Sequence, residues 1–164
     1  MEVSAPFDVH RERVRADWID YNGHMNVAYY VLAFDHATDA FLDAVGLDAA
    51  HREATGGSTF AVDSHVTYER EVAEGDPLRI TTQLLAFDAK RLHFFHRMYH
   101  ADDGYLAATS EWLNLYVDLN TRRVSAMPEA IQATLRAMRN AHATLGWPEQ
   151  AGRAIRVPEK KPTA

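Results

Sequence analysis

The sequence predicts a single α+β domain in which an antiparallel sheet packs on one long apolar helix. Three observations support this class. The pattern of apolar residues gives the order strand, long helix, four strands, helix. The connections between the four consecutive strands are short, which favours antiparallel neighbours. The chain has 164 residues, 47% of them hydrophobic, which fits one ordinary core and leaves no room for a second.

The first strand is expected over residues 9–15, where apolar and charged side chains alternate loosely. The long helix is expected from Asn26 to Val45, with Gly46 as its C-terminal cap. Apolar residues lie on nearly all sides of this helix, so we expect it to be buried. Its acidic residues recur every four positions and so form one narrow polar stripe: Asp35, Asp39 and Asp43.

Four strands are expected after a Gly56-Gly57 turn, with turn residues between them. They cover residues 59–69, 78–87, 91–100 and 106–118. A second, amphipathic helix is expected to begin at Met127-Pro128-Glu129 and to end before Gly146-Trp147-Pro148. We therefore expect one domain over residues 1–148 and a C-terminal tail over residues 149–164.

Composition excludes several classes of function. The chain has no cysteine, which excludes disulfides, thiolate zinc sites and a cysteine nucleophile. The net charge of -6 argues against general nucleic-acid binding. There is no pattern of a signal peptide at the N-terminus and no apolar run long enough to span a bilayer. We therefore expect a cytoplasmic protein that binds neither nucleic acid nor membranes.

The ten residues before the long helix carry the most chemistry. Two carboxylates, two carboxamides and a histidine lie in the segment Asp17-Trp18-Ile19-Asp20-Tyr21-Asn22-Gly23-His24-Met25-Asn26. A helix N-terminus has unpaired N–H groups and a partial positive charge. It can therefore hold a polarised carbonyl oxygen while a nearby carboxylate acts as base or nucleophile. The segment suits acyl transfer.

The order of elements and this segment together resemble the hotdog-fold thioesterases. Asp20-x-Asn22-x-His24-x-Asn26, with Tyr30 further on, is similar to the Asp-x-Asn-x-His-x-Asn segment of acyl-thioesterases. Asp20-x-x-Gly23 matches the aspartate of the 4-hydroxybenzoyl-CoA thioesterase branch, and Tyr68 and Gly75-Asp76 also resemble residues of this family. The resemblance covers residues 9–140. It implies a hotdog fold, a curled antiparallel sheet wrapped around a long central helix, with a C-terminal helix.

A narrower resemblance is to the betainyl-CoA thioesterases of carnitine degradation. It rests on four segments, 18–25, 37–40, 81–83 and 88–93, whereas residues 26–29 depart from that group. The resemblance implies an acyl-CoA thioesterase that hydrolyses a short-chain acyl-CoA, with betainyl-CoA as the candidate substrate. It implies a homodimer or homotetramer with active sites where two chains meet. It implies no cofactor, since coenzyme A is part of the substrate.

Within this resemblance Asp20 is the predicted catalytic carboxylate, as a base that activates water or as the nucleophile; helix capping is its structural alternative. Asn22 and His24 are predicted to orient the water or to donate to the oxyanion. The N–H groups predicted to point at the carbonyl are those near the helix start: Gly23, Met25 and Asn26. Asn26 is equally well placed to be the helix N-cap.

Binding residues are predicted in two groups. Coenzyme A phosphates could pair with Lys90, Arg91 and Arg97, although a charged hairpin tip is common without a ligand. The acyl pocket is expected to use aromatic faces, which attract a trimethylammonium group, with core packing as the alternative for each. The predicted aromatic residues are Trp18, Tyr21, Tyr29, Tyr30, Tyr68 and Trp112. Asp63 is predicted either to supply a negative charge that favours a cationic acyl group or simply to face solvent.

No metal site is predicted from the four strand histidines, His65, His93, His96 and His100. His96 and His100 share a face but lie about 13 Å apart at the rise of a strand, too far to share an ion, and His93 points the other way. Packing and hydrogen bonding are expected instead. Two other functions remain open: a hotdog-fold enoyl-CoA hydratase or dehydratase that uses Asp20 and His24, and a non-catalytic acyl-CoA-binding module.

Overall fold

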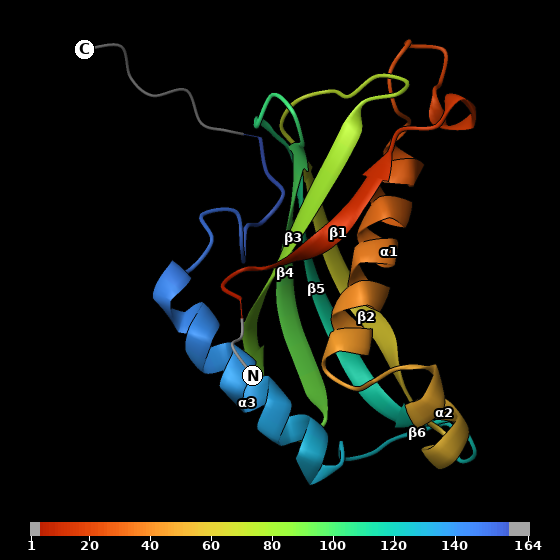
Figure 1. The fold of residues 1–164 in the computed structure, drawn as a ribbon, viewed down its shortest axis with the longest axis vertical. Helices are drawn as coiled ribbons and strands as arrows, with labels where there is room; N and C mark the ends of the chain where they lie inside the picture. The colour runs from red at the N-terminus through yellow and green to blue at the C-terminus, as the bar shows by residue number, and fades with distance from the viewer. Residues whose placement is uncertain (1–3, 158–164) are drawn as a thin grey trace.

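The structure, a computed structural model, describes residues 4–157. Its centre is a six-stranded antiparallel sheet with the order β1-β3-β4-β5-β2, in which the short β6 pairs with β5. Strands β1 and β2 are therefore the two edges of the main sheet (Figure 1). The strands are β1 (Phe7–Arg13), β2 (Gly57–Tyr68), β3 (Pro77–Phe87), β4 (Arg91–His100), β5 (Leu106–Asp118) and β6 (Arg123–Val124).

The central helix α1 (Val27–Ala44) packs against one face of this sheet, and α3 (Glu129–His142) lies on its other side (Figure 1). The core between α1 and the sheet contains Phe34 and Phe41 from the helix and Ile80, Phe94 and Met98 from the strands, each at most 1% exposed. Burying each such side chain contributes about 1.5–3 kcal/mol. This contact fixes α1, and with it the loop at its N-terminus.

Helix α3 packs its predicted apolar face, Ile131, Leu135 and Met138, toward the protein. It is tied to the sheet by His142, whose Nδ1 accepts the Leu84 N–H at 2.9 Å. The other ring nitrogen, Nε2, therefore donates to Ser4 O at 3.0 Å. Burial lowers the pKa of His142, which favours the neutral form that this arrangement requires.

The predicted α+β hotdog architecture is confirmed, with differences in detail. Helix α2 (Ala49–Thr55), two short 3-10 turns and β6 were not predicted. The expectation that α1 is buried on all sides is wrong, because Val27, Val31 and Leu32 are 36–56% exposed. Gly46, at φ +87°, follows the helix as predicted for a C-terminal cap. Within the segment expected as a tail, Gly152 N donates to Glu111 Oε2 at 2.6 Å, while residues 158–164 lie outside the described part of the chain.

Candidate functional site

The loop from Asp20 to His24 is held by its own backbone. Gly23 N donates to Asp20 O at 3.0 Å, and Asp20 N donates to His24 O at 3.2 Å. Gly23 has φ +81°, a conformation that favours glycine, which explains the Asp-x-x-Gly spacing. The loop is anchored beneath by Asn26 N, which donates to Trp18 O at 2.9 Å. The position of the Asp20 backbone therefore depends on main-chain bonds rather than on neighbouring side chains.

The Asp20 carboxylate lies just before the N-terminus of α1, as predicted. Its Oδ1 accepts the Asn22 N–H at 2.8 Å, and its Oδ2 accepts the Asn26 side-chain amide at 3.1 Å. The carboxylate is partly buried. Both donors are neutral, and within residues 4–157 no cationic side chain pairs with this carboxylate.

Asn26 is the N-cap of α1. Its Oδ1 accepts the Ala28 N–H at 3.0 Å while its Nδ2 donates to Asp20. One carboxamide therefore caps the helix and orients the carboxylate, which answers the question that the sequence left open. Asp20 itself is not the cap. Asp17 is exposed and pairs with Arg15 at 2.9 Å, as expected of a loop residue.

The three N–H groups predicted to bind the carbonyl oxygen are already engaged. Gly23 and Asn26 bond within the loop, and Met25 N donates to Val72 O at 2.9 Å while its side chain is buried. This corrects their predicted role. The N–H of Val27, the first residue of α1, has no hydrogen-bond partner among the described residues. Sequence reasoning missed it because the position of the N-cap, one residue earlier, was not settled.

His24 and Asn22 are placed less directly than predicted. His24 Nδ1 donates to Met25 O at 3.2 Å and its Nε2 lies 3.8 Å from Glu71 Oε2; in the described chain it makes no hydrogen bond to Asp20. Asn22 contacts Asp20 through its backbone N–H, and its side chain is exposed. Both residues belong to the loop that carries the carboxylate, and neither side chain makes a hydrogen bond to it within residues 4–157.

Four of the predicted aromatic residues gather at the start of α1. Trp18 stacks on Tyr29 with ring centroids 5.5 Å apart, and Tyr30 meets Tyr68 edge to face at 5.2 Å. Burial raises the pKa of Tyr30 and of Tyr68, so both stay neutral phenols at physiological pH. Tyr21, by contrast, is 96% exposed.

Trp112 and Asp63 lie elsewhere. Trp112 is buried on β5 beside Phe94, and its indole N–H has no partner among the described residues. Asp63 is exposed on β2 and lines a cavity of about 390 Å³ with His93, Glu111 and Arg153. Asp20 does not line this cavity.

The predicted coenzyme A residues are not beside Asp20 in one chain. The Asp20 loop is bonded near the start of β3, through Met25 to Val72 and through Val14 to Asp76, whereas Lys90 and Arg91 follow the end of that strand. Arg91 is exposed and pairs with Asp88. Arg97 lies on the sheet face away from α1, where it donates to Gln83 Oε1 at 3.2 Å.

The strand histidines pack and hydrogen bond, as predicted. His93 pairs with Glu111 at 2.7 Å on the outer face. His96 is fully buried between Thr38 and Thr82, each 2.9 Å from one ring nitrogen. Thr38 Oγ1 donates to Phe34 O, so His96 Nε2 donates to Thr38 and its Nδ1 accepts from Thr82. Burial lowers the pKa of His96 to about 3, which keeps the ring neutral.

Comparison with known proteins gives the class. The thioesterase-like superfamily matches residues 14–135, and the chain belongs to that family. Its structure is similar, with a TM-score of 0.87, to that of a Staphylococcus aureus protein solved in complex with CoA. The two sequences are 31% identical, and the match covers 96% of this chain and 100% of that one. A putative thioesterase from Pseudomonas putida matches with 33% identity and a TM-score of 0.82 over 95% of this chain and 99% of its own. The predicted class, a hotdog-fold thioesterase, is confirmed.

More particular relatives share sequence over nearly the whole length. The chain is 40% identical to a betainyl-CoA thioesterase of Pseudomonas aeruginosa over 145 residues, which is 88% of this chain and 91% of that protein. It is also 40% identical to an L-carnitine dehydrogenase/betainyl-CoA thioesterase of Ruegeria pomeroyi, over 96% of this chain and 32% of that longer protein. The described residues contain no helix that is both long and apolar enough to cross a bilayer.

Proposed function

We propose that this thioesterase hydrolyses a short-chain acyl-CoA, with betainyl-CoA as its substrate, and that Asp20 is the catalytic carboxylate. The observation that carries the proposal is the Asp20 carboxylate itself, oriented by two neutral donors immediately before the N-terminus of α1. The relatives named for betainyl-CoA support the choice of acyl group.

In the general-base form of the reaction, Asp20 takes a proton from water as the water oxygen bonds to the thioester carbon. The carbonyl oxygen becomes an oxyanion, for which the candidate donors are the positive end of α1 and the Val27 N–H, which has no partner within residues 4–157. Collapse of the tetrahedral intermediate breaks the C–S bond, and the proton held by Asp20 passes to the departing thiolate. In the nucleophilic form Asp20 attacks directly and water hydrolyses the anhydride.

These two forms can be separated by a single turnover in ¹⁸O-labelled water. A labelled oxygen in the protein after the turnover identifies Asp20 as the nucleophile, with water attacking the anhydride at the aspartyl carbon. A base leaves the protein unlabelled, as does attack by water at the acyl carbon of the anhydride. Mass spectrometry of the peptide that contains Asp20 measures the difference.

The aromatic side chains at the start of α1 support a cationic acyl group. Tyr29 and Tyr30 lie within one helical turn of the N-cap Asn26, and Tyr68 of β2 meets Tyr30 edge to face. Cation–π attraction between such rings and a desolvated quaternary ammonium is worth ~2 kcal/mol. That energy corresponds to a preference of about 30-fold. We therefore expect kcat/KM for betainyl-CoA to exceed that for the isosteric, uncharged tert-butylacetyl-CoA by about 30-fold. Equal use of both would overturn the cationic pocket and leave thioester hydrolysis standing.

A homodimer or homotetramer is part of this proposal. Apolar side chains are exposed on the edge strand β2 and on the adjoining part of α1, and an uncovered edge strand favours pairing with a second chain. They are Val27, Val31, Leu32, Phe60, Val62 and Tyr68. A second chain on this surface would enclose the Asp20 loop, which is open in the single chain. Sedimentation equilibrium tests it: a fully active monomer would contradict a site shared between chains.

The activity itself is tested by free thiol release from a panel of acyl-CoAs. Hydrolysis supports the proposal. Hydration of an enoyl-CoA without thiol release would indicate the hydratase, and binding without turnover would indicate a binding module. A cytoplasmic location and a reaction without a cofactor complete the proposal, and both rest on the sequence.

A further inference from the structure

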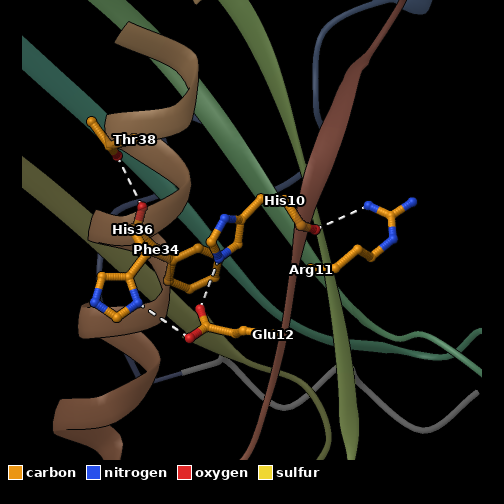
Figure 2. Close-up of polar contacts among 6 residues, drawn as sticks. All are labelled: His10, Arg11, Glu12, Phe34, His36 and Thr38. Carbon is orange, nitrogen blue, oxygen red and sulfur yellow. Dashed lines mark hydrogen bonds and ion pairs between the residues drawn. The ribbon is translucent and has the colours of Figure 1, made fainter. Parts of the chain in front are cut away.

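A cluster of two histidines and one glutamate joins the edge strand β1 to the middle of α1. His10 and Glu12 are two residues apart on β1 and so share the face toward the helix, where His36 of α1 meets them (Figure 2). Glu12 Oε1 lies 2.9 Å from His10 Nε2, and Glu12 Oε2 lies 3.2 Å from His36 Nδ1. The potential ligand atoms of all three lie within 4.8 Å of one another.

Glu12 is a mostly buried carboxylate whose recorded partners are only imidazoles. Its side chain is 16% exposed, and within residues 4–157 no lysine or arginine pairs with it. The adjacent Arg11 is engaged elsewhere, with Asp8 and with the carbonyl of His10. Burial raises the pKa of Glu12, but hydrogen bonds from His10 and His36 outweigh this and leave the pKa below its usual value. The carboxylate is therefore charged at neutral pH.

This donor set matches a divalent transition metal. Two imidazole nitrogens and one carboxylate oxygen are ligands that zinc prefers, at bond lengths of about 2.0–2.2 Å. Tetrahedral coordination at these lengths separates neighbouring donors by about 3.4 Å. The two nitrogen–oxygen distances of 2.9 and 3.2 Å end on different oxygens of Glu12, Oε1 and Oε2, and one ligand atom of each residue lies within 4.8 Å of the other two. Rotation of the Glu12 carboxylate and of the two imidazoles would bring one oxygen and both nitrogens to the tetrahedral spacing.

We propose that His10, Glu12 and His36 form a binding site for a divalent transition metal ion, zinc in the first place, which ties β1 to α1. Water completes the coordination on the side of His36, whose side chain is 42% exposed. His36 lies nine residues after the start of α1, about 13 Å along the helix axis from the end that holds Asp20. The proposed ion is therefore structural and takes no part in thioester hydrolysis.

The site departs from the expectation that the chain holds no metal. That expectation considered histidines on the later strands, where the strand rise keeps them apart. His10 and His36 are separated by 26 positions along the chain, and only the packing of β1 on α1 brings them together.

The test uses the full chain without an affinity tag, stripped with a chelator, and zinc alone as the probe. Isothermal titration should give one zinc per chain with micromolar or tighter affinity. At a free zinc concentration of 100 times Kd the melting temperature should rise by about 8 °C. His36→Ala should weaken binding at least 10-fold and reduce the rise in melting temperature at the same free zinc concentration to about half or less, because the variant removes one ligand from a half-buried helix position.

His93→Ala is the matched control, since it removes a histidine that pairs with a single glutamate on the outer face. It should bind zinc as the wild type does. Wild-type protein that shows no saturable zinc binding up to 100-fold molar excess would overturn the proposal. Equal affinity in the wild type and in His36→Ala would overturn it too. If His36→Ala lowered the melting temperature while zinc changed neither protein, the cluster would be a hydrogen-bonded contact only.

Discussion

The start and the middle of α1 each adjoin a polar side chain from another part of the chain, Asp20 of the preceding loop and His96 of β4, but the hydrogen bonds of these two side chains differ in kind. At the start, the Asp20 carboxylate accepts from two neutral donors and remains partly open to solvent. At the middle, His96 is fully buried and both ring nitrogens are satisfied by threonine hydroxyls. A charged group with spare acceptor capacity is available for chemistry, whereas a neutral group with every bond made contributes to stability. One helix therefore separates the two tasks along its length.

The largest effect is expected from a substitution that alters only the site at the start of α1. Asp20→Asn should fold normally, because the loop is held by backbone bonds, and should lose at least ~100-fold in turnover, the scale of a positioned acid or base. Thiol release measures turnover and thermal melting measures folding. Asp17→Asn, at an exposed residue of the same segment, is the control and should keep nearly the wild-type rate. Near wild-type turnover in Asp20→Asn would remove this residue from the mechanism.

The second substitution alters only the hydrogen bonds of His96 at the middle of α1. His96→Leu keeps much of the volume but leaves the Thr82 hydroxyl buried without its partner, which should cost about 2 kcal/mol of unfolding free energy. Turnover per folded molecule should not change. Urea denaturation measures the first quantity and the thiol assay the second. A variant that lost turnover but kept its stability would contradict the division of tasks.

A fall in pH should lower the stability of the protein through the same buried side chain, His96. The pKa of His96 is about 3 in the folded chain against an ordinary value of 6.5, so below pH 6.5 the unfolded chain binds the extra proton first. Stability from this group is therefore complete above about pH 6.5 and is lost as the pH falls toward 3. Between pH 6.5 and 5.5 the wild type should lose about 1 kcal/mol more than His96→Leu. Parallel stability profiles for the two proteins would show that His96 titrates normally.

The last variant changes Asn26, the residue that serves both tasks. Asn26→Ala should cost about 1 kcal/mol of stability through the lost N-cap and should lower turnover about 10-fold through the lost contact with Asp20. Asn26→Ser restores a capping oxygen without the amide. It should therefore recover most of the stability but not the rate. Recovery of both by serine would show that the amide does not orient Asp20.

The sequence predicted what local patterns determine. The apolar spacing of α1, the glycine at position 46 and the strand alternation each depend on near neighbours, and each was found in place. Asp20 was likewise predicted from a contiguous segment. The predictions that failed concerned whether a backbone N–H group is free to bind a ligand. Whether the Met25 N–H is free depends on Val72, which is 47 positions away along the chain. The His10, Glu12 and His36 cluster was missed for the same reason.

The Asp20 loop has one more consequence. Its main chain fixes the carboxylate, while the side chains of Tyr21 and Asn22 project outward and take no part in holding the loop. Mutation at these two positions can therefore alter the rim that an incoming acyl group meets without shifting the reactive oxygens. In such a scaffold substrate preference can diverge between descendants while the chemical step is inherited unchanged.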